Sequence, residues 1–224
     1  MENNVNLIAK DLKLRSEAMA AGASMPAMND AGPEIDLVIR QSLKTGSELM
    51  ASCAALASGP HELAINVLIR SLIELGLKAH WATLSIENAK HLLASSKEQA
   101  KALFMANVRT GIATMRDKEG NDLTVEFVAS GHVKRAQKPL SIEEMSKQCG
   151  LHDIYNVFYR FQSMHAHGND TSSESSTTRP GTLCCVGAFS MFLGHVGVRW
   201  LVSRCRPDNE EIRELLGLNA SAQP

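Results

Sequence analysis

Residues 61–84 read HELAINVLIRSLIELGLKAHWATL, and this stretch decides the fold. Apolar side chains recur along it at helical spacing and cover most of its circumference. A helix of that kind is expected in the middle of a bundle, where neighbouring helices cover it. Gly59 and Pro60 separate it from a second helical pattern that starts at Pro33, a residue well suited to a first helical position.

The rest of the chain follows the same helical spacing, and no stretch alternates convincingly between apolar and polar side chains. Ser141 and Glu144 have the spacing of a capping box, and Asp153 can cap the helix that follows it. The least regular pattern contains TVEFV, which also suits a short strand. Further helices are expected over 3–20, 86–115, 123–136, 141–150, 153–167, 182–204 and 208–216. The predicted fold class is all-α, a helical bundle of about six to eight helices.

A chain of 224 residues with no internal repeat and no visible boundary suits a single domain. The segment GNDTSSESSTTRPG is the one low-complexity stretch and predicts a flexible loop. The expected order is an N-terminal helix and turn (1–32), a core bundle (33–204) that includes the flexible loop (168–182), and a C-terminal helix and tail (205–224).

Composition excludes two classes of nucleic-acid binder. The 23 basic and 24 acidic residues nearly balance, so a globally basic protein is excluded, although a local basic face is not. Aromatic residues make up only 4% of the chain, too few for an extended base-stacking platform.

The chain is expected in the cytoplasm. Its first residues lack the apolar core of a signal peptide, and its five cysteines form no CxxC pair, which favours reduced thiols. Residues 183–202 are apolar enough for a membrane span, but they contain His195 and Arg199. Charge inside a lone span is costly, so we expect a core helix and no membrane partner.

The helix that ends in YRFQSMHAHG carries the most chemistry. Arg160 and His167 are seven positions apart, and seven residues return a helix to within about 20° of the starting direction. Ser163 lies on the same stripe, whereas His165 is about 140° from Arg160. An imidazole can act as general base on a ribose 2′-hydroxyl, and a guanidinium can hold a phosphate. Spacing alone also allows a simpler interpretation, in which His167 binds the last helical carbonyls.

An arginine, a few residues and a histidine near the end of a helix in an all-α bundle resemble the HEPN superfamily. Two stretches are similar to a bacterial HEPN-related family of unknown function. They are LIRSLIELGLKAHW, which contains Arg70 and Glu74, and GLHDIYNVFYRFQSMHAHG, which contains Tyr159.

The resemblance implies a metal-independent endoribonuclease that uses no cofactor, of the kind found as toxins and phage-defence effectors. It implies that Arg160 is the motif arginine, and either His167 or His165 satisfies the loose spacing of the motif histidine. The helix face and the Ser-x3-His-Gly pattern favour His167 as the catalytic partner. Ser163, His165 and Tyr159 would support the site. Arg70 and Glu74 would lie beneath it, or form a buried ion pair that satisfies itself. The resemblance also implies a homodimer, an RNA substrate, and a cognate antitoxin or regulatory protein as partner.

Two other functions stay open at this point. Phe161 follows Arg160 where active HEPN members often carry a polar residue, which favours a catalytically inactive module that binds RNA, a nucleotide or a protein. His165 and His167 could also serve a metal-dependent hydrolase. Positions i and i+2 of a helix lie on different faces, however, and no acidic cluster lies beside the pair, so no metal ligand is assigned.

Overall fold

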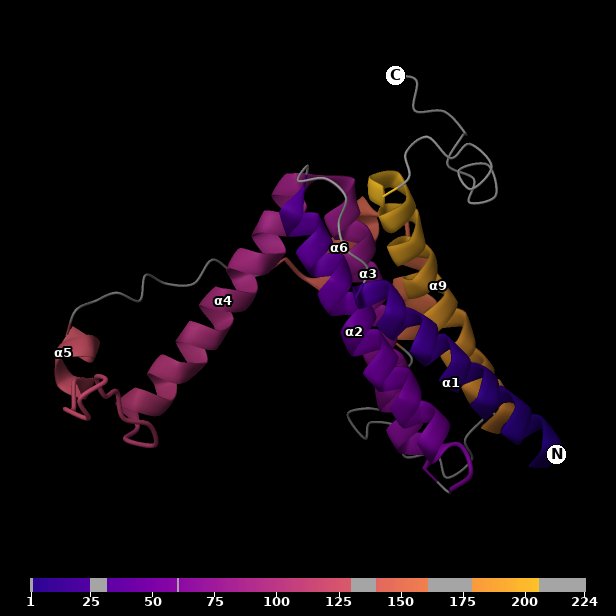
Figure 1. Cartoon of the computed structure of the whole chain (residues 1–224), viewed down its shortest axis with the longest axis horizontal. Helices are drawn as coiled ribbons and strands as arrows, with labels where there is room; N and C mark the ends of the chain where they lie inside the picture. The colour runs from indigo at the N-terminus through magenta and orange to yellow at the C-terminus, as the bar shows by residue number, and fades with distance from the viewer. Residues whose placement is uncertain (1, 25–31, 60, 130–139, 161–178, 206–224) are drawn as a thin grey trace, which may run out of the picture. The chain divides into compact units, whose positions relative to one another are not determined.

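The computed structural model describes residues 2–24, 32–59, 61–129, 140–160 and 179–205. In these ranges the regular structure is helical and no strand occurs, which confirms the all-α prediction. Figure 1 shows the elements in order along the chain. They are α1 (Glu2–Ser24), α2 (Pro33–Leu56), α3 (Glu62–Leu84), α4 (Ile86–Arg109), α5 (Thr124–Ala129), α6 (Ile142–Gln148), α7 (His152–Ile154), the π-helix η1 (Tyr155–Tyr159) and α9 (Arg179–Cys205).

The chain divides into two compact units. The first comprises Met1–Ala89 with Ser141–Pro224, and the second comprises Lys90–Leu140. No boundary of this kind was expected from the sequence, because the helical pattern of α4 runs through residue 89 without a break. The single domain stays a prediction.

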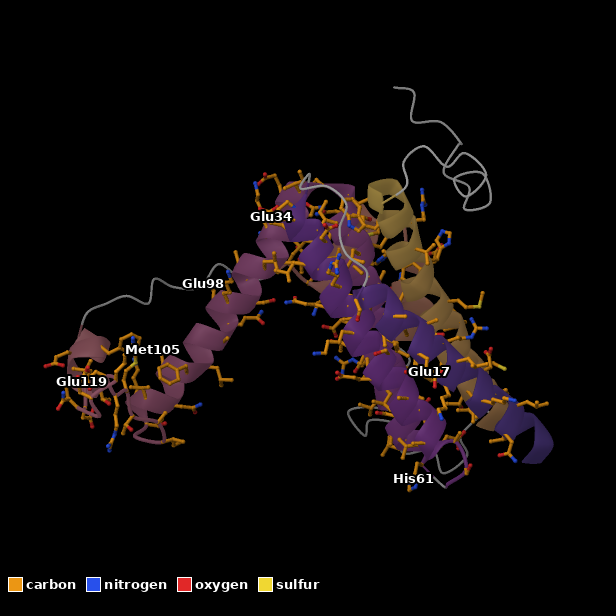
Figure 2. All side chains as sticks on the ribbon, in the orientation of Figure 1. Glu17, Glu34, His61, Glu98, Met105 and Glu119 are labelled. Carbon is orange, nitrogen blue, oxygen red and sulfur yellow. The ribbon has the colours of Figure 1, made fainter. Side chains whose placement is uncertain are left out.

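In the first unit, α3 packs against α2, α6, η1 and α9. Its buried side chains include Ile69, Leu72, Ile73 and Leu77, each with no exposed surface. The apolar stretch that decides the fold therefore lies in the core, as predicted. Figure 2 shows the side chains on these elements, with Glu17 on α1 and Glu34 in the first turn of α2.

Helix α9 lies against α1, α2 and α3. Three glycines let it approach closely: Gly76 faces Phe192, Gly46 faces Leu193, and Gly197 faces Leu43. Leu183, Val186, Leu193 and Val196 of α9 are buried in the bundle. Gly181–Trp200 is nevertheless the one stretch of the described residues that is long and apolar enough to cross a membrane. The cysteines whose side chains are described, Cys53, Cys149, Cys184 and Cys185, are free.

The second unit has a small core of its own. Phe104 of α4 and Phe127 of α5 meet edge to face, with ring centroids 6.3 Å apart, and Met105 beside them is buried. Between the helices, the Asp117 carboxylate accepts hydrogen bonds from the backbone and side-chain nitrogens of Asn121, each at 2.8 Å. These bonds lower the pKa of Asp117.

Several predicted boundaries were right and others were wrong. The capping box is present, with the Glu144 N–H donating to Ser141 Oγ at 3.2 Å and the Ser141 N–H donating to Glu144 Oε2 at 2.9 Å. Asp153 does not cap its helix, because α7 begins one residue earlier and Leu151 is the N-cap. The TVEFV stretch is helical and not a strand, since the Leu123 carbonyl accepts from the Phe127 N–H.

Two helix ends also differ from the prediction. Helix α4 ends at Arg109 and not near residue 115, because Gly111 adopts a left-handed φ of 73° that stops the helix. Helix α9 begins at Arg179, so residues 179–182 of the predicted flexible loop are helical. The rest of that loop and the predicted helix over 208–216 lie outside the described residues.

Candidate active site

A stripe of charged residues runs along α3, and two of its members contact η1. Arg70, Glu74 and Lys78 are spaced four residues apart, so their side chains follow one side of the helix. Lys78 Nζ lies 2.6 Å from Glu74 Oε1, and these side chains are 37% and 32% exposed. Such a half-exposed ion pair contributes little stability by itself. Its effect here is to hold the Glu74 carboxylate in place.

Tyr159 of η1 connects Arg70 and Glu74. Its hydroxyl accepts a hydrogen bond from Arg70 Nη2 at 3.2 Å and donates one to Glu74 Oε2 at 3.4 Å. The guanidinium carbon of Arg70 also lies 5.2 Å from the centroid of the Tyr159 ring, within range of a cation–π interaction. From the sequence, Arg70 and Glu74 could also form an ion pair that satisfies itself. The structure instead shows both side chains half-buried and tied to the neighbouring helix through Tyr159.

Aromatic rings hold η1 in position. His152 stacks on Tyr155 with centroids 5.8 Å apart, and Tyr155 stacks on Tyr159 at 5.2 Å. Phe158 points to the other side and meets Phe189 of α9 edge to face at 5.3 Å. Hence η1 is attached to α3 through Tyr159 and to α9 through Phe158.

The helix changes its hydrogen-bond pattern just before Arg160. The Arg160 N–H donates to the Tyr155 carbonyl, five residues back, which makes residues 155–159 a π-helical turn. Turns of this kind are rare and frequently occur at functional sites. Arg160 itself returns to α-helical dihedrals, with φ −66° and ψ −41°, and its side chain is exposed.

Helix α6 supplies a carboxylate near Arg160, that of Glu143, which was not predicted from the sequence. Lys147 Nζ donates to Glu143 Oε1 at 2.7 Å. This bond and the Lys147 charge lower the pKa of Glu143, and the charges of His152 and Arg160 lower it further. Glu143 therefore lies within electrostatic reach of the Arg160 guanidinium. In the sequence, the only indication of this role was that Glu143 lies in the capping-box helix, shortly before the aromatic residues of 155–159.

Part of the predicted site lies outside the described residues. Ser163, His165 and His167 belong to that part, and so does Phe161. The spacing argument that joins Arg160 to His167 therefore stays a prediction. The structure does bring together Arg70, Glu74 and Tyr159 and places Arg160 next in the chain.

A cavity of about 280 Å³ lies elsewhere in the first unit, between α1, α2 and α9. It contains none of the predicted site residues, and Arg15 at its edge is paired with Asp11 at 2.6 Å. Among the described residues, no group of three His, Cys, Asp or Glu side chains is placed to hold a metal ion.

Residues 36–180 match the model of a family of unknown function, DUF5677. The chain belongs to this family. No curated protein and no solved structure matches the chain. The DUF5677 range contains Arg70, Glu74, Tyr159 and Arg160, together with both candidate histidines, and it ends as α9 begins.

Proposed function

We propose that this DUF5677 chain is a HEPN-like, metal-independent endoribonuclease with Arg160 and His167 as its catalytic pair. The observation that carries the proposal is the anchored, exposed arginine. Arg160 directly follows Tyr159, whose hydroxyl is bound by Arg70 and Glu74 of the core helix. These bonds fix the residue before Arg160, and the Arg160 side chain itself is exposed. An exposed guanidinium on a fixed backbone is suited to bind a phosphate group.

The reaction needs a base and an anion-stabilising group. The His167 imidazole takes the proton of a ribose 2′-hydroxyl, and the 2′-oxygen attacks the adjacent phosphorus. The bond from phosphorus to the 5′-oxygen breaks, and the proton ends on that oxygen. Arg160 stabilises the negative charge that develops on the phosphate oxygens. The products carry a 2′,3′-cyclic phosphate and a 5′-hydroxyl.

In this proposal Arg70, Glu74 and Tyr159 are positioning residues. They act on the phosphate through the backbone of η1, because Tyr159 and Arg160 are neighbours in the chain. Glu143 offers Arg160 a nearby carboxylate before RNA binds. Ser163 and His165 would line the same helix and support the substrate.

The biological setting belongs to the same proposal. A toxin or phage-defence effector in the cytoplasm, active as a homodimer and restrained by a cognate antitoxin or another regulatory protein, agrees with the HEPN resemblance. The near-neutral net charge of −1 favours local contacts to RNA over general attraction to nucleic acid.

A catalytically inactive HEPN-like module is the second candidate. The observation in its favour is Phe161, an apolar residue directly after Arg160. In such a module the Arg70–Tyr159–Glu74 contacts would hold a helix that binds RNA, a nucleotide or a partner protein without cleaving anything.

Expression in bacteria separates the two candidates. We expect the wild type to arrest growth and Arg160→Ala to be harmless at equal protein levels, because the arginine stabilises the transition state. Arg109→Ala is the matched control, since Arg109 is exposed at the end of α4 in the other unit; it should stay toxic. Equal toxicity of wild type and Arg160→Ala would exclude the nuclease as its cause.

A further inference from the structure

A histidine of α3 packs against α9 outside the candidate active site. The ring of His80 lies beside Phe192, with centroids 6.1 Å apart and planes tilted by 55°. Phe192 also covers Gly76, one turn earlier on α3, so closely that a Cβ there would lie 2.6 Å from its ring. These contacts establish which face of α9 lies beside His80.

His195 and Arg199 are on that same face of α9. They follow Phe192 by three and seven positions, the spacing of a single helical stripe. Both side chains are exposed, whereas His80 is half-buried. We refer to His80, His195 and Arg199 as the basic cluster. Its two α9 side chains are accessible from solvent.

No acidic side chain balances the basic cluster in the described part of the chain. None of its three side chains forms an ion pair or hydrogen bond there with a carboxylate. The pKa of His80 is lowered, first by burial and then by the charges of Arg199 and His195. Both of the neighbouring charges that lower this pKa are positive. Gathering like charges costs free energy, and a bound anion would offset that cost.

We propose that the basic cluster binds a phosphate group through the Arg199 guanidinium and the His80 and His195 imidazoles. A guanidinium presents a planar pair of donors that matches two phosphate oxygens, and each imidazole adds an N–H donor. The site uses none of the residues of the proposed nuclease, and His195 and Arg199 lie beyond the DUF5677 range. The phosphate is either the terminal monoester of a nucleotide or the diester of an RNA backbone.

Nuclear magnetic resonance of the histidine rings in the full chain tests this site. The probes are inorganic phosphate, adenosine 5′-monophosphate and dimethyl phosphate, each at constant ionic strength set with chloride. Phosphate should shift the ring signals of His80 and His195 and raise their pKa values, because an anion stabilises the imidazolium. His61, at the start of α3 (Figure 2), is the internal control and should not respond.

A variant identifies the groups responsible. Arg199→Gln should weaken phosphate binding by at least about tenfold, because the variant loses the charge and one of the two guanidinium hydrogen bonds. Arg15→Gln, which removes a guanidinium from α1, should leave it unchanged. If dimethyl phosphate binds as tightly as adenosine 5′-monophosphate, the site is assigned to an RNA backbone. If adenosine 5′-monophosphate binds more tightly, the site is assigned to a nucleotide. The proposal is overturned if His80 and His195 respond no more than His61, or if Arg199→Gln binds phosphate as the wild type does.

An RNA cleavage assay on the same protein distinguishes failure of the phosphate site from failure of the proposed nuclease. Failure of the phosphate titration would leave RNA cleavage by Arg160 and His167 untouched. Equally, an inactive chain whose His80 and His195 respond to phosphate would refute the nuclease and support the basic cluster.

Discussion

Tyr159 is the residue that joins the candidate site to the core of the bundle. Its hydroxyl bonds both Arg70 and Glu74. Tyr159→Phe should therefore lower the free energy of unfolding by about 1–2 kcal/mol, because Arg70 and Glu74 both lose their hydrogen bond to the hydroxyl. Urea denaturation measures the loss.

Tyr155→Phe is the matched control. The Tyr155 ring stacks on its neighbours, and its hydroxyl forms no hydrogen bond with the described residues. It should change stability by less than about 0.5 kcal/mol. Equal losses in both variants would mean that the Tyr159 hydroxyl bonds are not what holds η1 on α3.

The two histidines at the predicted helix end should differ in their effect on activity. His167→Ala should abolish RNA cleavage with little change in stability, since a residue at a helix end has little packing to lose. His165→Ala should retain most of the activity, because position 165 points away from the Arg160 stripe. Rates on a defined RNA, with circular dichroism of each variant, provide the comparison. Loss of activity in His165→Ala alone would reverse the assignment.

At the scale of residues, the sequence predicted those groups whose role depends on local spacing. Ser141 and Glu144 form their capping box because three positions are enough to define it. The resemblance named Arg70, Glu74 and Tyr159 as supporting residues. The hydrogen bonds that join them span 89 and 85 positions and have no signal in local spacing. The prediction that Asp153 caps its helix was wrong, because Leu151 is the N-cap and Asp153 already lies inside the helix.

At the scale of elements, the approach of α3 and α9 depends on Gly76. A Cβ at this position would lie 2.6 Å and 2.7 Å from ring atoms of Phe192. Gly76→Ala should lower stability, because overpacking costs about 1–3 kcal/mol and the gain in helix propensity is about 1 kcal/mol. The melting temperature measures the change.

Gly187→Ala on α9 is the control for helix propensity. Nothing lies within 4 Å of a Cβ at this position. The variant should gain up to about 1 kcal/mol, because alanine is the better helix former. A gain in both variants would show that Phe192 moves aside without cost.

Helical periodicity predicted the existence of the long elements well and their ends less well. The core helix of residues 61–84 was expected and is α3. The pattern of α4 continued in the sequence beyond Arg109, but the left-handed Gly111 ends the helix. The π-helical turn of η1 has no periodic signature in a window this short, so the sequence did not indicate it.

At the scale of the whole molecule, we expect a homodimer with the Arg160 helix near the two-fold axis. A single arginine and a single histidine make a sparse site, and a second copy doubles the charge that faces the phosphate. Phe158 is 39% exposed and Val157 is 61% exposed, so apolar surface remains on η1 for an interface. Light scattering at micromolar concentration should report the mass of two chains.

Mixed subunits test whether the two copies share one cleft. Arg160→Ala and His167→Ala proteins should each be inactive, and mixing them should restore part of the activity. A chain that cleaves RNA as a strict monomer would contradict the shared cleft.

In the proposed function, Arg160 stabilises the transition state of RNA cleavage without a metal ion. The most direct measurement incubates the purified protein with single-stranded RNA in excess EDTA and identifies the new ends by mass spectrometry. We expect 2′,3′-cyclic phosphate and 5′-hydroxyl ends with the wild type and intact RNA with Arg160→Ala. Intact RNA with the wild type, or cleavage that requires added zinc or manganese, would contradict the proposed function.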